Sequence, residues 1–213
     1  MKLLLVLLVL SGPVLAQWGG RPRYYRKHHL TGSIGAGLPR GELRPYFGDS
    51  FGLNVGYGYR FHPNFQVDVG LDTLFHAARV KDFFESQFGD LRIRDYQFLL
   101  PIGGRAILPL ASGRLQFHGG GGGAYMRYQE RIRQPFGDAY FRLECPVCRS
   151  RGGWGYYALA GSSVALDRRQ HFRLGVTTKV YRGNTEGDAF GQLPAIRSRD
   201  RWLNVFGEFG VSF

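Results

Sequence analysis

The chain has 213 residues, a formal net charge of +12, and 32 glycines alongside 17 phenylalanines and 12 tyrosines. This aromatic content is high for a linker or a disordered chain, and this glycine content is high for an ordinary globular core. After residue 16, Gly, Arg, Asp or Pro breaks every apolar stretch within a few residues, which excludes a helical inner-membrane protein. Glycines and aromatics together favour one domain of many twisted strands.

The first residues have the pattern of a secretory signal peptide. Lys2 supplies a positive charge, residues 3–10 are an unbroken Leu/Val run, and Val14-Leu15-Ala16 offers a small-residue cleavage site. The run is too short for a spanning helix, which needs about 20 apolar residues. We predict a signal peptide over 1–16, a basic periplasmic leader over 17–29 and a β-barrel domain over 30–213. Export also argues against a nucleic-acid partner, despite the positive charge.

Apolar and polar residues alternate with a period of two along the rest of the chain. The pattern is clearest at residues 51–61 and 65–71, on either side of the short turn His62-Pro63-Asn64. Two alternating runs around a tight turn predict a β-hairpin. Weaker runs predict six further strands, with the register of the sixth strand along the chain left open: about 30–38, 95–108, 115–128, 154–166, 172–180 and 201–213.

The connections between these runs alternate in length. Those near residues 39–50, 77–94, 129–153 and 182–200 are long and polar, and the others are short turns. Short turns at one end and long loops at the other are typical of outer-membrane barrels. The sequence therefore predicts an all-β fold, an eight-stranded antiparallel up-and-down transmembrane β-barrel in the cell outer membrane, with four long loops facing the exterior.

The two faces of each strand predict which side meets lipid. A soluble lipocalin-like barrel would turn its apolar face inward, but here the other face carries too many charges to line an apolar cavity. We expect Val55, Val69 and Val176 to contact hydrocarbon, and we expect no solute pore because eight strands leave an interior that side chains fill. Aromatic girdles are expected at Phe51, Phe61, Phe65, Tyr125, Trp154 and Trp202.

The polar face predicts a network of charges inside the barrel, because buried charges without partners would cost several kcal/mol each. Asp68 or Asp72 is expected to pair with Arg60 or Arg105. The full set of candidate lumen charges is Arg60, Asp68, Asp72, Arg105, Lys179 and Glu208.

Two segments resemble a known family. Residues 209–213 (FGVSF) resemble the terminal signal that barrel assembly machinery recognises, and residues 100–105 followed by 117–128 are similar to the central hairpin of the OmpA/OmpW-like outer-membrane β-barrel family. This resemblance implies that the assembly machinery is a partner during biogenesis. It implies an assembly signal at Phe209, Val211 and Phe213, and it allows a narrow channel for small hydrophobic compounds as an alternative function.

Two motifs invite chemical interpretations. Cys145-Pro146-Val147-Cys148 has the spacing of a redox pair, half a zinc site or a small-ring disulfide. No other cysteine can complete a zinc site, so we favour a local disulfide in an exported loop and expect no metal or cofactor. The glycines at 119–123 lack the Lys-Ser/Thr of a phosphate loop and favour close approach of neighbouring strands.

Some small barrels modify lipids, which requires a nucleophile and a base near the outer leaflet. His62, His118 and His171 are expected near the periplasmic end, and His76 has no assignable Ser or acid partner. We therefore expect no catalytic residues, and a lipid-modifying enzyme stays an alternative. The leading hypothesis is a non-enzymatic integral outer-membrane protein with a structural or surface-interaction role in the long loops.

Basic residues in the long loops suggest contacts with membrane lipid and lipopolysaccharide, since Arg pairs well with phosphate. A solvated basic surface is the alternative, and the oligomeric state is left open. The candidate phosphate contacts are Arg149, Arg151, Arg197 and Arg199.

Overall fold

The computed structural model describes residues 25–45, 47–75, 83–86, 89–132, 150–187 and 197–213. In this part of the chain, eight long strands form a closed ring and β4 (Phe83–Ser86) pairs only with β5. The strands of the ring are β1 (His28–Pro39), β2 (Ser50–His62), β3 (Phe65–Phe75), β5 (Gly89–Leu110), β6 (Leu115–Ile132), β7 (Ser150–Ala165), β8 (Phe172–Gly187) and β9 (Arg197–Ser212).

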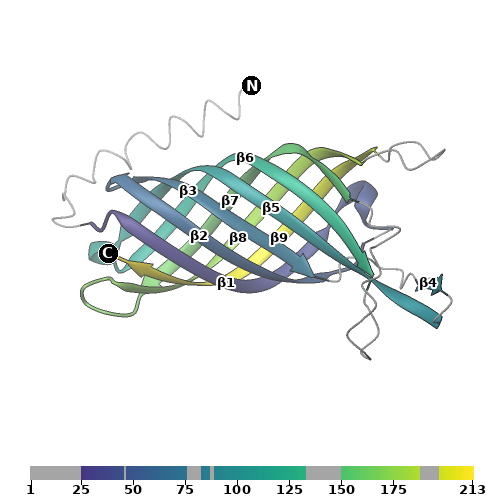
Figure 1. Ribbon diagram of the computed structural model, residues 1–213. Helices are drawn as coiled ribbons and strands as arrows, with labels where there is room; N and C mark the ends of the chain where they lie inside the picture. The colour runs from purple at the N-terminus through teal and green to yellow at the C-terminus, as the bar shows by residue number, and fades with distance from the viewer. Residues whose placement is uncertain (1–24, 46, 76–82, 87–88, 133–149, 188–196) are drawn as a thin grey trace, which may run out of the picture.

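Each strand of the ring pairs antiparallel with the next, and β1 pairs with β9 to close it. Figure 1 shows the resulting barrel of tilted strands. The predicted eight-stranded up-and-down barrel is confirmed. None of the helices in the described residues has the length and apolar character to cross a membrane.

The strands extend beyond their predicted ends. β1 begins at His28, so the last two residues assigned to the leader belong to the barrel. β7 begins at Ser150 and pairs Val164 with Leu115 of β6, which settles the register of this strand. The proposed signal peptide and most of the leader lie outside the described residues.

Short connections gather at one end of the barrel, called the short-turn end (Figure 1). They include the 3-10 turn η2 (Ala111–Gly113) and the turn between β7 and β8. In the latter, the Asp167 carboxylate accepts from the Phe172 amide and contacts the His171 ring, each at 3.0 Å. The Phe172 amide first, and then His171, lower the pKa of Asp167. The opposite end, where the longer connections start and finish, is called the long-loop end.

The apolar face of the strands points away from the barrel axis. Val55, Val69 and Val176 are 65%, 46% and 52% exposed, whereas Asn54 and Asp68, the residues before Val55 and Val69, are buried. This orientation, predicted from the alternation, places a continuous apolar surface on the outside. Phe51, Phe61, Phe65 and Trp154 are also exposed, as expected of girdle residues.

One predicted girdle residue was assigned to the wrong face. Trp202 is fully buried in the barrel interior, because it alternates with the outward-facing Arg201 and Leu203 of β9. Its ring packs against Phe47 from the β1–β2 connection, with ring centroids 5.8 Å apart. Proximity to a strand end predicted the position of Trp202 along the barrel axis, but it did not predict whether the side chain points inward or outward.

The glycine run of β6 allows neighbouring strands to approach closely. A Cβ on Gly122 would lie 2.2 Å from the Ile102 carbonyl oxygen of β5, and one on Gly121 would lie 2.5 Å from the Tyr157 carbonyl oxygen of β7. A side chain at either position would therefore force the backbones apart, whereas Gly123 has open space around it.

Candidate functional site: the filled lumen and the basic outer rim

A hub of hydrogen bonds around Asp72 crosses the middle of the lumen. The Asp72 carboxylate of β3 is fully buried and accepts from Asn54 Nδ2 at 2.6 Å, from Lys179 Nζ at 2.7 Å and from the Tyr181 hydroxyl at 2.8 Å. Asn204 Nδ2 of β9 adds a bond of 3.3 Å. These partners come from β2, β8 and β9, so the hub connects opposite walls of the barrel.

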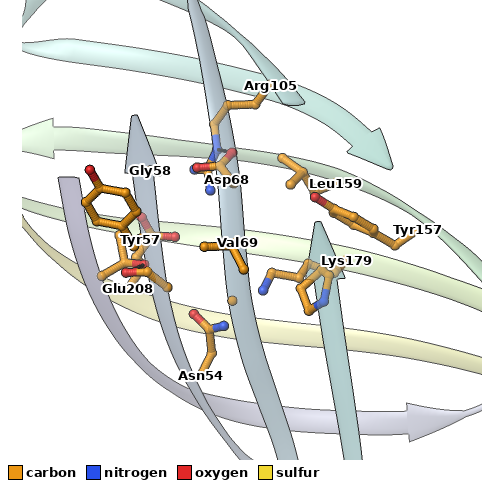
Figure 2. Close-up of a pocket in the computed structure, with 14 residues that line it drawn as sticks. Asn54, Tyr57, Gly58, Asp68, Val69, Arg105, Tyr157, Leu159, Lys179 and Glu208 are labelled. Carbon is orange, nitrogen blue, oxygen red and sulfur yellow. Dashed lines mark hydrogen bonds and ion pairs between the residues drawn. The ribbon is translucent and has the colours of Figure 1, made fainter. Parts of the chain in front are cut away.

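A second layer lies beside Asp68, toward the short-turn end. Arg105 Nε of β5 contacts the Asp68 carboxylate at 2.5 Å, and Gln66 Nε2 donates to it at 2.6 Å. Figure 2 shows Arg105 directed at Asp68, with Lys179 and Glu208 lining the same small cavity. Of the pairings that the sequence allowed, the structure contains Asp68 with Arg105.

The other members of the predicted lumen network have different partners. Arg60 Nη2 donates to Gln116 Oε1 at 3.3 Å and forms no ion pair among the described residues. Glu208 accepts from the Thr177 hydroxyl at 2.8 Å. Lys179, for which no partner was predicted, forms the ion pair with Asp72.

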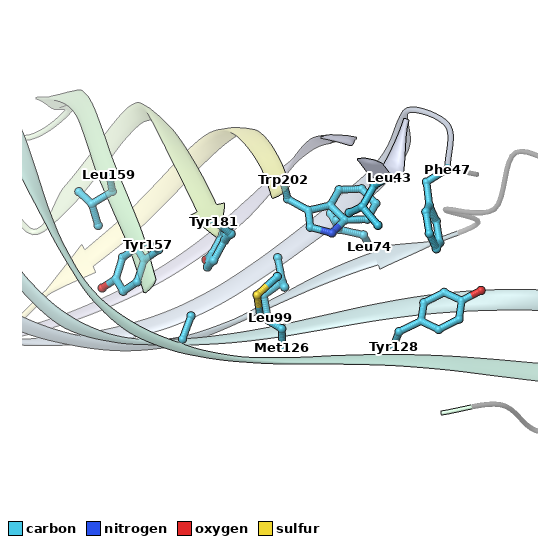
Figure 3. Close-up of a cluster of buried hydrophobic side chains, with 11 residues drawn as sticks. Leu43, Phe47, Leu74, Leu99, Met126, Tyr128, Tyr157, Leu159, Tyr181 and Trp202 are labelled. Atoms are coloured by element: carbon cyan, nitrogen blue, oxygen red, sulfur yellow. The ribbon is translucent and has the colours of Figure 1, made fainter. Parts of the chain in front are cut away.

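A hydrophobic cluster fills the lumen toward the long-loop end (Figure 3). The connection after β1 turns inward, so Leu43 of η1 (Gly41–Leu43) and Phe47 lie against Trp202. Phe47 also packs edge-on against Tyr128, with centroids 5.3 Å apart. The cluster consists of Leu43, Phe47, Leu74, Leu99, Ala124, Met126, Tyr128, Tyr157, Leu159, Tyr181 and Trp202.

Together, these layers fill the middle of the lumen, where the cavities are small. The cavity beside Asp68 has a volume of about 20 Å³, and a second one beside His118 has about 30 Å³. A site needs roughly 10–15 Å³ for one water molecule, so each cavity has room for only one or two. Neither of these two cavities has room for a solute larger than water.

The proposed phosphate contacts at the long-loop end do not form one group. Arg151 faces into the barrel, where its guanidinium lies 4.8 Å from the Tyr128 ring centroid and 3.7 Å from the buried Asp200 carboxylate. The prediction of an outward phosphate contact at Arg151 is therefore wrong, because β7 starts four residues earlier than expected and its alternation turns this residue inward. Arg149 lies outside the described residues.

The remaining two candidates point outward. Arg197 is exposed and forms an ion pair of 2.9 Å with Glu186, and Arg199 is exposed on the same face of β9. Arg201 continues this row and is paired in register with the exposed Arg182 of β8. The sequence analysis missed Arg182, although extending the alternation of β8 past Val180 identifies its side. We call the exposed residues Arg182, Arg197, Arg199 and Arg201 the basic outer rim.

Aromatic residues flank the basic outer rim. Tyr156 of β7 is 59% exposed and is paired in register with Arg182, and Trp154 is 69% exposed. Aromatic side chains of this kind lie at the membrane–water interface of barrels. The basic outer rim consequently borders the headgroup region, where lipid phosphates are found.

A contact between His118 and Thr177 in the described part of the interior has a superficial likeness to a catalytic group. His118 bonds to the Thr177 hydroxyl at 3.0 Å, and this hydroxyl donates to Glu208. In a catalytic triad the acid orients the histidine, whereas here the acid holds the hydroxyl, and Thr177 is only 1% exposed. Among the described residues, no cluster of His, Cys, Asp or Glu has the makeup of a metal site. Cys145 and Cys148 lie outside them.

The residues of the proposed assembly signal lie on the outer face of β9. Phe209 and Phe213 are 46% and 55% exposed, and the Phe209 ring stacks on Phe172. Phe213 exchanges two backbone hydrogen bonds with His28 of β1, where the ring closes. Val211 lies between the two phenylalanines on the same face.

A closed ring of antiparallel strands, an apolar outer surface and a lumen filled by polar and aromatic side chains define a small outer-membrane β-barrel. No protein-family model matches the chain, and no curated protein matches its sequence. Solved structures of small outer-membrane barrels share its fold. OprG, an outer membrane protein from Pseudomonas aeruginosa, aligns with a TM-score of 0.58 and 13% identity, over 89% of this chain and 97% of its own. Neisserial surface protein A aligns with a TM-score of 0.52 and 12% identity, over 87% and 97%.

Proposed function

We propose that the protein is a non-enzymatic integral outer-membrane protein whose barrel is a filled scaffold and whose work is done at its outer surface. The observation that carries this proposal is the filled lumen, in which the Asp72 hub, the Asp68–Arg105 pair and the hydrophobic cluster lie in series. A barrel without a solute path leaves the loops and the lipid-facing rim as its working surfaces.

Conductance in a planar bilayer tests the absence of a solute path. We expect the purified chain to show no stable single-channel steps. We expect the same of Trp202→Ala, because the layers around Asp72 and Asp68 still block the lumen on the short-turn side of the hydrophobic cluster. Steps in the wild-type protein would contradict the proposal. They would favour the alternative, a narrow channel for small hydrophobic compounds. Such a channel would also require a lateral opening in the barrel wall.

We further propose that the basic outer rim contacts lipopolysaccharide phosphates. Support comes from its outward orientation and its position beside Trp154 and Tyr156. Guanidinium groups bind phosphate in a bidentate manner, and Arg199 forms no ion pair among the described residues that would compete with a phosphate.

The test compares Arg199→Gln and Arg201→Gln with Arg114→Gln, an exposed arginine at the short-turn end. Association with lipopolysaccharide vesicles should weaken and become less dependent on salt in the first two variants only. Equal association of all three variants would contradict the rim as a phosphate contact. A lipid-modifying enzyme would instead appear as altered lipid A after overexpression of the wild-type chain.

A further inference from the structure

The short-turn end of the barrel opens into a cavity of about 330 Å³ that is strongly basic. A cavity of this size matches the lower end of small-ligand sites. Among the described residues that line it there is no Asp or Glu, and the arginines are Arg26, Arg60, Arg168, Arg169 and Arg173.

Two of these arginines are buried and belong to the barrel wall. Arg60 of β2 is 6% exposed and Arg173 of β8 is 7% exposed. The Arg173 guanidinium donates to the carbonyl oxygens of Gly113 and Arg114 and to Ser163. Arg60 Nη2 donates to Gln116, but its Nε is buried with no hydrogen-bond partner. Neither arginine forms an ion pair within the described residues.

The acidic groups with electrostatic influence on these arginines are already engaged. Asp68 is paired with Arg105, Glu208 accepts from Thr177, and Asp167 accepts from the Phe172 amide. Residues 1–41 contain no Asp or Glu, so no side-chain carboxylate from them balances the two arginines. Burying a cation without a counter-charge is unfavourable, and a bound anion would offset this cost.

The geometry points to an anion site at the short-turn mouth of the barrel, formed around Arg60 and Arg173, that binds a phosphate group. Arg60 and Arg173 both line the cavity, so phosphate oxygens accepting from their guanidinium groups would supply the missing counter-charge. Two or more negative charges suit the several arginines around the site. In the proposed orientation the cavity faces the periplasm. The phosphate can belong to a small soluble molecule or to a headgroup of the inner leaflet.

Calorimetry with pyrophosphate as the probe tests this site, using the full chain in neutral detergent micelles at constant ionic strength. Wild type and the matched control Arg114→Gln should bind pyrophosphate with saturation. Arg60→Gln should bind at least about tenfold more weakly, since it loses a charge-assisted hydrogen bond. Absence of saturable binding to wild type, or equal binding by Arg60→Gln and Arg114→Gln, would overturn the proposal.

Stability in urea gives a second readout. Without pyrophosphate, Arg60→Gln should be at least as stable as wild type, because it removes an unpaired buried charge. With pyrophosphate, only proteins with an intact site should gain stability, as expected for a ligand of the folded state. Arg60→Lys, which keeps the charge but loses the planar fork, should bind with intermediate strength. If the glutamine variant does not fold, this variant and the wild-type titration decide.

The two sources of phosphate are separated in lipid nanodiscs. Adding phosphatidylglycerol to a phosphatidylcholine nanodisc should weaken pyrophosphate binding if a headgroup reaches the site. It should have no effect if the site takes a soluble phosphate.

Discussion

Lys179 and Asp72 form an ion pair of 2.7 Å across the barrel, although 107 residues separate them and their strands, β8 and β3, lie on opposite sides of the ring. Both side chains are almost completely buried. A pair in this position joins walls that share no backbone hydrogen bonds, so it contributes to the barrel as a closed body and not to a single strand pairing.

Breaking this pair should destabilise the barrel strongly. Lys179→Met leaves the Asp72 carboxylate buried with only neutral donors, and we expect a loss of about 3–5 kcal/mol in the free energy of unfolding. Urea titration of the barrel refolded into vesicles measures this loss. Arg197→Gln is the control, because the Arg197–Glu186 pair is exposed and should contribute no more than about 1 kcal/mol. Similar losses in both variants would contradict a special role for the buried pair.

The glycine run of β6 offers a comparison between adjacent positions. Gly122→Ala places a Cβ against the Ile102 carbonyl oxygen and should cost about 1–3 kcal/mol by overpacking. Gly123→Ala has open space and should change stability by less than about 0.5 kcal/mol. Unfolding midpoints of the two variants check the difference, and a reversed order would show that β5 and β6 do not approach each other closely at Gly122.

The stability cost of a charge on the lipid-facing surface should depend on its depth in the membrane. Val55→Arg introduces a charge near the centre of β2 and should cost about 2–4 kcal/mol, whereas Phe61→Arg, near the end of the same strand, should cost about 0–1 kcal/mol. Refolding into vesicles with urea titration measures both. Equal costs would mean that the apolar face does not contact hydrocarbon.

The turn between β7 and β8 predicts a response to pH. Because the Phe172 amide and His171 lower the pKa of Asp167 in the folded protein below its usual value near 3.8, the ionised carboxylate stabilises the fold above that pH. The stabilisation is lost as the pH falls below 3.8 toward the folded value. The difference in urea midpoint between wild type and Asp167→Ala should therefore be constant at neutral pH and shrink under acid conditions. A difference that persists at low pH would show that the carboxylate charge is not responsible.

The strand pattern alone was sufficient for the fold, because alternation with a period of two is a local property. The runs at 51–61 and 65–71 predicted β2, β3 and the outward orientation of Val55 and Val69. Alternation does not define the strand starts near the long loops, since the sequence there is polar on both faces. The side of Arg151 was predicted wrongly because no apolar face marks the start of β7.

The sequence by itself determined that this is a β-barrel with apolar residues outside and charges inside, because alternate residues of each strand form its two faces. Only the tertiary structure decided which charges meet. Whether Asp72 pairs with Lys179 or with an arginine depends on the stagger and tilt of strands on opposite walls, and no local pattern encodes that geometry. The inward turn of Leu43 and Phe47 and the unpaired burial of Arg60 likewise follow from closure of the ring.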